Sequence, residues 1–183
     1  QDSQVVVSRD SRGSWKVLKP AVIQGFLDSG CRVLDADIIP LPTTQVAIME
    51  LSAQGGIDIT ASHNPKEYNG LKLLNHNGEY IDEEVLESIL ENYKKYLEDF
   101  NVSFDIEEIE NINQKAIDWH LNRLDSIINF NSSKKLVVAL DAVNGAGSII
   151  VPKLLEKMNC EVIHLATNPE EPFPHIPEPT PEN

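Results

Sequence analysis

Short apolar runs alternate with longer stretches of helical periodicity along this chain. Residues 5–7 form a β-branched run, which favours a buried strand. Residues 17–29 carry apolar side chains at the spacing of one helical face. Further strand patterns occupy 32–39, 57–60 and 71–74, and further helical patterns occupy 45–54, capped by Thr43 or Thr44, and 82–97. This alternation predicts an α/β layer fold with a largely parallel sheet.

The beginning of the chain is repeated near its end. Residues 5–10 (VVVSRD) align with residues 136–141 (LVVALD), and each copy continues through a glycine-containing loop into an apolar helix. The repeat predicts two related α/β units, which we place at residues 1–105 and 106–183, the second opening with a linker helix at 112–128. Two strands and one helix bury little core, so we expect the second unit to be incomplete.

Charge and apolar content exclude several classes of function. The chain has 29 acidic and 15 basic side chains, a formal net charge of -14, which argues against nucleic-acid binding and against docking on an anionic membrane. No apolar run approaches the ~20 residues of a membrane span. The cysteines, Cys31 and Cys160, form no disulfide framework, so we expect a cytoplasmic protein. Because Gln1 is not an initiator methionine, we expect a trimmed piece of a longer chain.

One polar loop carries the candidate chemistry. The strand at 57–60 leads into Ala61-Ser62-His63-Asn64-Pro65, at the sheet edge where α/β proteins bind ligands. A serine hydroxyl is a weak nucleophile and needs a base, a metal or preorganised donors. A turn at Asn69-Gly70 returns the chain, so Lys72 is expected close to the loop. Lysine supplies positive charge for a phosphate or a proton for acid–base work.

Other motifs are weaker. The histidines outside this loop lack the spacing of metal ligands. Residues 144–147 (NGAG) lack the glycine spacing of a dinucleotide fingerprint, and the chain has no Walker A sequence.

Taken together, residues 60–65 (TASHNP) and 68–72 (YNGLK) closely resemble the active-serine signature of the α-D-phosphohexomutases, the phosphoglucomutase/phosphomannomutase family. Residues 9–12 (RDSR), 41–44 (LPTT) and 178–183 (EPTPEN) are similar to other segments of that family. The resemblance implies a three-layer α/β/α domain with a mostly parallel mixed sheet, followed by the start of a second similar α/β domain.

The resemblance also implies roles for single residues. Ser62 would carry the phosphoryl group, Lys72 would act as general base or acid, and His63 would orient the phosphoryl group or the sugar hydroxyl. Asn64 would shape the loop. Arg12 would support the loop or a phosphate, or form a structural salt bridge. A phosphate oxygen on Ser62 would join three aspartates in holding Mg²⁺, and hexose 1,6-bisphosphate would act as activator.

The family pattern is not complete in this chain. Ser8 and Trp15 stand where the family often has glycine. The family's opening Arg-Gly motif is absent before Gln1, and its Asp-Gly-Asp-Gly-Asp-Arg metal loop would lie beyond Asn183. Its sugar-recognition loop and C-terminal phosphate-binding domain would belong to the remaining C-terminal domains of the same polypeptide. We therefore expect the 183-residue chain to be inactive as a mutase on its own.

Three alternatives stay open. Residues 66–75 slightly resemble bacterial phosphoglucosamine mutases, so a glucosamine phosphate competes with other hexose phosphates as the small-molecule substrate. A hydrolase using Ser62 and His63 would need an orienting acid and an oxyanion hole, and the Gly-x-Ser-x-Gly elbow is absent. A non-catalytic phosphosugar-binding module would keep the fold without phosphorylation of Ser62.

Overall fold

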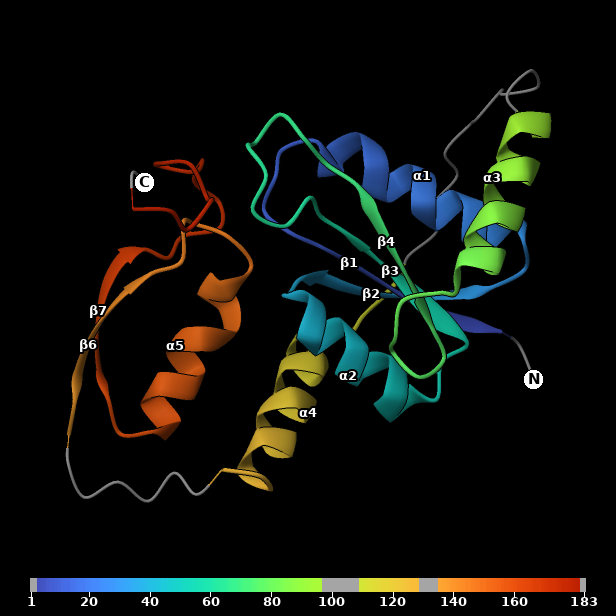
Figure 1. Ribbon diagram of the computed structural model, residues 1–183. Helices are drawn as coiled ribbons and strands as arrows, with labels where there is room; N and C mark the ends of the chain where they lie inside the picture. The colour runs from blue at the N-terminus through green and yellow to red at the C-terminus, as the bar shows by residue number, and fades with distance from the viewer. Residues whose placement is uncertain (1–2, 97–108, 129–134, 182–183) are drawn as a thin grey trace.

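The computed structural model describes residues 3–96, 109–128 and 135–181. A larger unit built on a mixed sheet occupies the first two of these stretches, and a smaller unit of two strands and a helix occupies the third (Figure 1). The α/β class predicted from the sequence is confirmed. None of the helices in these stretches combines the length and apolar character needed to cross a membrane.

The sheet of the larger unit has five strands in the order β4-β3-β1-β2-β5. The strands are β1 (Gln4–Arg9), β2 (Arg32–Ile38), β3 (Gly55–Ile59), β4 (Leu71–Asn75) and β5 (Glu110–Asn111). Strands β3, β1, β2 and β5 are parallel, and β4 is antiparallel to β3. The sheet is therefore mostly parallel and mixed, as the sequence predicts.

Two apolar clusters hold helices against the two faces of this sheet. Val5, Val7 and Ile57 face α1 (Trp15–Asp28), whose Ile23 is buried among them. Val6 and Leu34 face the opposite way, toward α2 (Leu41–Leu51) and α4 (Asn113–Asp125). Successive side chains along β1 therefore point into two separate cores, one on each face of the sheet. The sheet and the helices on its two faces form the three layers of the unit. The remaining helix, α3 (Glu83–Tyr96), follows β4.

Two boundaries differ from the sequence prediction. Helix α2 begins at Leu41 rather than at Gln45, so Thr43 and Thr44 are buried within the helix and do not cap it. Pro42 is tolerated because the first turn of a helix lacks partners for its N–H groups. Strand β1 extends through Arg9, so Ser8 belongs to the sheet rather than to the following loop.

The smaller unit consists of β6 (Val137–Asp141), α5 (Gly147–Lys157) and β7 (Glu161–Ala166), with the two strands parallel. Ile150 of α5 joins the core cluster of the larger unit, so the two units share apolar contacts. Helix α4, predicted as a linker, packs on the larger unit through Ala116, Ile117 and Leu121. The predicted boundary between residues 105 and 106 lies outside the described residues.

Candidate active site

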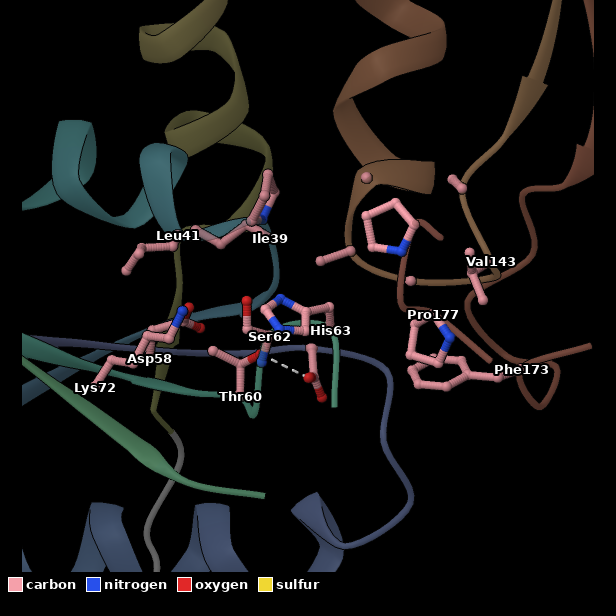
Figure 2. A pocket seen from close by; sticks show the side chains of 17 residues that line it. Ile39, Leu41, Asp58, Thr60, Ser62, His63, Lys72, Val143, Phe173 and Pro177 are labelled. Atoms are coloured by element: carbon pink, nitrogen blue, oxygen red, sulfur yellow. Dashed lines mark hydrogen bonds between the residues drawn. The ribbon is translucent and has the colours of Figure 1, made fainter. Parts of the chain in front are cut away.

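A cavity of about 390 Å³ opens where the two units meet (Figure 2). The larger unit supplies polar groups at the carboxyl ends of its strands, and the smaller unit supplies the loop before α5 and the segment after β7. The lining residues of the larger unit include Asp10, Asp58, Thr60, Ser62, His63 and Lys72, and those of the smaller unit include Val143, Gly145, Gly147, Phe173, Pro177 and Pro179. Ligands bind α/β sheets at this edge.

Ser62 stands three residues beyond the end of β3, on a tight turn. Its backbone is left-handed, with φ of 58°, and its N–H donates to the Thr60 hydroxyl at 3.0 Å. The backbone N–H of Asn64 and its side-chain amide both donate to the Ala61 carbonyl, at 3.1 and 3.0 Å. The loop therefore presents an exposed serine at the cavity on a backbone fixed by local hydrogen bonds.

Arg12 lies beneath this loop with its side chain fully buried. Its Nη1 donates to the carbonyls of Pro65 and Tyr68, at 2.6 and 3.0 Å. Its Nη2 donates to the carbonyls of Ser62 and Asn64, at 2.9 and 2.7 Å.

The fifth donor of Arg12, Nε, pairs with Asp10 Oδ2 at 2.8 Å. An arginine has five N–H donors, so all are engaged and none is left for a phosphate. Asp10 also accepts from the Arg12 N–H at 3.0 Å and from the Thr60 hydroxyl at 2.7 Å. The ring of Phe173, from the smaller unit, lies 5.3 Å from the guanidinium carbon. Arg12 thus combines a salt bridge with support of the serine loop.

His63 and Lys72 reach the cavity from different sides. His63 is exposed, and its Nε2 lies 3.1 Å from Oε2 of Glu178, in the segment that closes over the loop. Lys72 stands on β4 directly opposite Asp58 of β3. Figure 2 shows His63 beside Ser62 and places Lys72 with Asp58 at the left, on the side opposite Val143 and Phe173. Of the predicted site residues, Ser62, His63 and Lys72 line the cavity, whereas Arg12 and Asn64 support the loop.

Asp58 is a cavity residue that the sequence reasoning missed. The residue is almost wholly buried, with 2% exposed, and Ser8 donates to its Oδ1 at 3.0 Å. Burial raises the pKa of Asp58 to about 6, against the lowering effects of the Ser8 hydrogen bond and of Lys72, while nearby Asp10 raises it further. A lone acid inside the apolar strand Gly-Gly-Ile-Asp-Ile was the available signal.

Comparison with known protein families accounts for most of the chain. The model described as phosphoglucomutase/phosphomannomutase, alpha/beta/alpha domain I, matches residues 1–100, and the model for domain II matches residues 118–183. The chain belongs to the phosphoglucomutase/phosphomannomutase family.

Relatives in this family carry more than one name. A phosphoglucomutase/phosphomannomutase of Thermococcus kodakarensis is 41% identical over 98% of the chain and 40% of its own length. A probable phosphoglucosamine mutase of Methanosarcina barkeri is 37% identical over 97% of the chain and 40% of its own length. The chain therefore spans about two fifths of the length of the curated relatives it matches.

Solved structures share the fold. A phosphoglucomutase/phosphomannomutase family protein from Burkholderia thailandensis covers 94% of the chain, with 38% of its own chain matched, at 26% identity and a TM-score of 0.69. A structure from Thermus thermophilus covers 99% of the chain, with 41% of its own chain matched, at 23% identity and a TM-score of 0.82; this likeness concerns the fold alone.

Metal-ligating side chains do not gather in the described part of the chain. Within residues 3–96, 109–128 and 135–181, no group of three or more His, Cys, Asp or Glu side chains is placed to hold a metal ion. The carboxylate nearest to Arg12, that of Asp10, is already engaged by three donors. The described residues alone do not form a Mg²⁺ site.

Proposed function

We propose that residues 1–183 form the phosphoserine-bearing part of a phosphohexomutase, an isomerase that interconverts hexose 1-phosphate and hexose 6-phosphate. The observation that carries the proposal is the exposed Ser62 on a rigid loop, facing a cavity that also receives Lys72 and His63. The names of the relatives support the reaction class, and their greater length supports further domains in the complete polypeptide.

In the proposed reaction, a hydroxyl oxygen of the hexose monophosphate attacks the phosphorus on Ser62. The bond from phosphorus to the serine oxygen breaks, and the serine oxygen takes the electron pair. The attacking hydroxyl loses a proton and the serine oxygen needs one, so a single group can serve both ends. Lys72 is the proposed proton carrier, because it lines the cavity and its amine exchanges protons. A hexose bisphosphate results, and its other phosphate returns to Ser62 after the sugar turns over.

The rigid loop contributes positioning. Phosphoryl transfer depends on alignment and charge stabilisation more than on covalent chemistry by the protein. Arg12 fixes four carbonyls around Ser62, and the His63 imidazole, held by Glu178, can orient the phosphoryl group. Mg²⁺, when bound, would offset negative charge on the transferring group, and its protein ligands would come from outside the described residues. We assign the cation no further step.

A first test locates phosphate on the complete polypeptide isolated from its own cells, by peptide mass spectrometry. We expect phosphate on the peptide that contains Ser62, and its loss on incubation with a hexose monophosphate. If Ser62 stays unphosphorylated even with hexose 1,6-bisphosphate and Mg²⁺, the mutase proposal is refuted and a phosphosugar-binding module is favoured. A panel of glucose, mannose and glucosamine phosphates would then choose the substrate, with the phosphoglucosamine mutase relatives as the reason to include the amino sugar.

The His63–Glu178 pair favours one alternative, a serine hydrolase, because it supplies an orienting acid. Within the described residues, however, no hydrogen bond joins the Ser62 hydroxyl to His63. A fluorophosphonate label separates the two reactions, since a hydrolase serine reacts with it and a mutase serine should not. Stoichiometric labelling of Ser62 would replace the mutase proposal by the hydrolase.

A further inference from the structure

Asp58 belongs to a polar row that crosses three strands. It lies opposite Ser8 of β1 on one side and opposite Lys72 of β4 on the other. Side chains directly opposite each other on neighbouring strands share a face of the sheet and interact. Figure 2 shows Asp58 and Lys72 on the same side of the cavity, as the β3–β4 register requires. The row therefore connects the interior of the larger unit to the residue proposed to carry the proton.

The position of this row is costly for a carboxylate. In the adjacent row, Val6 and Leu74 belong to the apolar core beneath α2, and Gly56 between them lies against Ile48 of that helix. Ser8 and Asp58 are as deeply buried as that core. An apolar side chain at residue 58 would extend the core without the cost of a buried charge. Perturbed, buried carboxylates that face a cavity cluster at functional sites.

The polar and charged neighbours of Asp58 come from several elements. The Ser8 hydroxyl, 3.0 Å from Asp58 Oδ1, also lies 2.8 Å from Thr44 Oγ1 of α2, which holds one side of the carboxylate. The charged groups acting on Asp58 are Asp10, from the end of β1, and Lys72, from β4. Asp10 repels it and Lys72 attracts it, and the β3–β4 register, rather than a direct ion pair among the described residues, places Lys72 beside Asp58.

We propose that Asp58 is a positioning residue whose carboxylate holds the Lys72 ammonium in place for proton exchange at Ser62. The inference deepens the proposed function and rests on it. It assigns Asp58 no contact with substrate: the carboxylate acts through Lys72, and Ser8 and Thr44 keep the carboxylate in position.

The first test measures the titration of Asp58 in the complete polypeptide, labelled with ¹³C at its aspartate carboxyls. The Asp58 resonance is identified by its absence in Asp58→Asn. We expect a midpoint near the pKa of about 6. In Lys72→Met the midpoint should rise, because the attracting cation is lost. Ser8→Ala should also raise it, through loss of the hydrogen bond. A midpoint unmoved in Lys72→Met would overturn the proposal.

The second test measures single-turnover phosphoryl transfer from phosphorylated Ser62 to a hexose monophosphate. Acid–base groups contribute about 10²–10⁴-fold, so loss of positioning in Asp58→Asn should lower the transfer rate about 10–100-fold with little change in KM. Asp58→Asn added to Lys72→Met should lower the rate no further, because the two act in one chain. Asp28→Asn, at the exposed end of α1, is the control and should transfer at the unmodified rate.

The outcomes separate this proposal from the function on which it rests. An unmodified protein that transfers phosphate to no hexose monophosphate refutes the mutase, while the carboxyl titration still reports on the Asp58–Lys72 pair. An Asp58→Asn rate equal to the unmodified rate overturns the positioning role alone, as does a further loss in the double variant. If Asp58→Asn does not fold, Asp58→Val, whose apolar side chain suits the buried site, identifies the resonance instead, and the shift in Lys72→Met remains decisive.

Discussion

At the scale of single residues, Arg12 explains why the serine loop has one shape. Loops seldom have a buried scaffold, because their carbonyls usually face water. Here one guanidinium takes up four loop carbonyls, and the charge is balanced by Asp10. The backbone around Ser62 is thereby set from inside the protein, and the serine side chain is free to meet the cavity.

Removal of Arg12 should therefore cost far more than removal of an exposed arginine. Arg12→Met leaves the Asp10 carboxylate and four carbonyls without their partner, and we expect a loss of about 3–5 kcal/mol in the free energy of unfolding. Arg32→Met removes an arginine whose side chain is 60% exposed and paired with Glu110, and should cost under about 1 kcal/mol. Urea denaturation measures both; equal losses in the two variants would contradict this account.

Asp58 gives a prediction on pH and stability. Its folded pKa of about 6 exceeds the ordinary value of 3.8, so the folded state binds the proton more tightly than the unfolded state. Well below its ordinary pKa of 3.8 the residue is protonated in both states and costs nothing. As the pH rises toward 6 and beyond, the ionised residue destabilises the fold, by about 3 kcal/mol at about 1.4 kcal/mol per pH unit.

Asp58→Asn should remove this cost. We expect the variant to be more stable than the unmodified protein at pH 7.5, by up to about 3 kcal/mol, and to lose most of that advantage at pH 4. Urea denaturation at the two pH values checks the sign, with Asp28→Asn, at the exposed end of α1, as the control. A variant less stable at pH 7.5 would mean that the carboxylate is needed for folding rather than for function.

The sequence predicts the candidate catalytic residues of this cavity better than their supports. Ser62, His63 and Lys72 follow from a motif because each is close to the others along the chain or across one turn. Asp58 does not, because its cost and its partner depend on burial and on the β3–β4 register. The engagement of all Arg12 donors likewise depends on carbonyls 50 to 56 residues away along the chain, which no local pattern contains.

At the scale of elements, α2 approaches β3 more closely than a side chain would allow. A Cβ at Gly56 would lie 2.6 Å from the Val6 carbonyl oxygen and 2.9 Å from Cδ1 of Ile48 in α2. The helix is therefore seated directly over the strand that ends at the serine loop. The same seating places Thr44 against Ser8, and so links the start of α2 to Asp58.

Gly56→Ala should force this layer apart. The carbonyl oxygen belongs to the backbone and cannot move aside like a flexible side chain, so we expect a loss of about 1–3 kcal/mol. Gly25→Ala is the matched control, because a Cβ there meets nothing within 4 Å in an exposed turn of α1. That change should stabilise the protein by about 0.5–1 kcal/mol. Thermal or urea unfolding measures the stability of both variants. If Gly56→Ala is the more stable of the two, α2 does not pack as closely on β3 as described.

The strand and helix pattern predicts these elements well, but it misplaces the start of α2. The prediction depends on threonine as a cap, whereas Thr43 and Thr44 are buried and serve tertiary contacts with His120 and Ser8. A first turn that contains proline and begins after Pro40 supplies the start instead. The preference of threonine for a capping position is therefore overridden here by contacts between α2 and elements distant in sequence.

At the scale of the whole molecule, the smaller unit closes the cavity over the serine loop. Asn144, buried in the loop before α5, connects three segments. Its carbonyl accepts from the Ser11 hydroxyl at 2.7 Å, which joins the two units. Its side chain accepts from the Asn168 N–H at 2.9 Å and donates to the Pro172 carbonyl at 2.9 Å. Phe173 and Glu178, which contact Arg12 and His63, follow directly along the chain.

Loss of the Asn144 side chain should therefore free the segment at 168–179 without disturbing the sheet. Asn144 is left-handed, with φ of 54°, so Asn144→Gly keeps the backbone and its carbonyl contact and removes the two side-chain hydrogen bonds. At about 1 kcal/mol for each bond, amide hydrogen exchange in this segment should accelerate about 10–30-fold. Asn159→Gly, also at a left-handed asparagine with φ of 58°, introduces the same backbone freedom away from the segment and should leave its exchange unchanged. Equal exchange rates in the two variants would show that Phe173 and Glu178 hold the segment on the serine loop without Asn144.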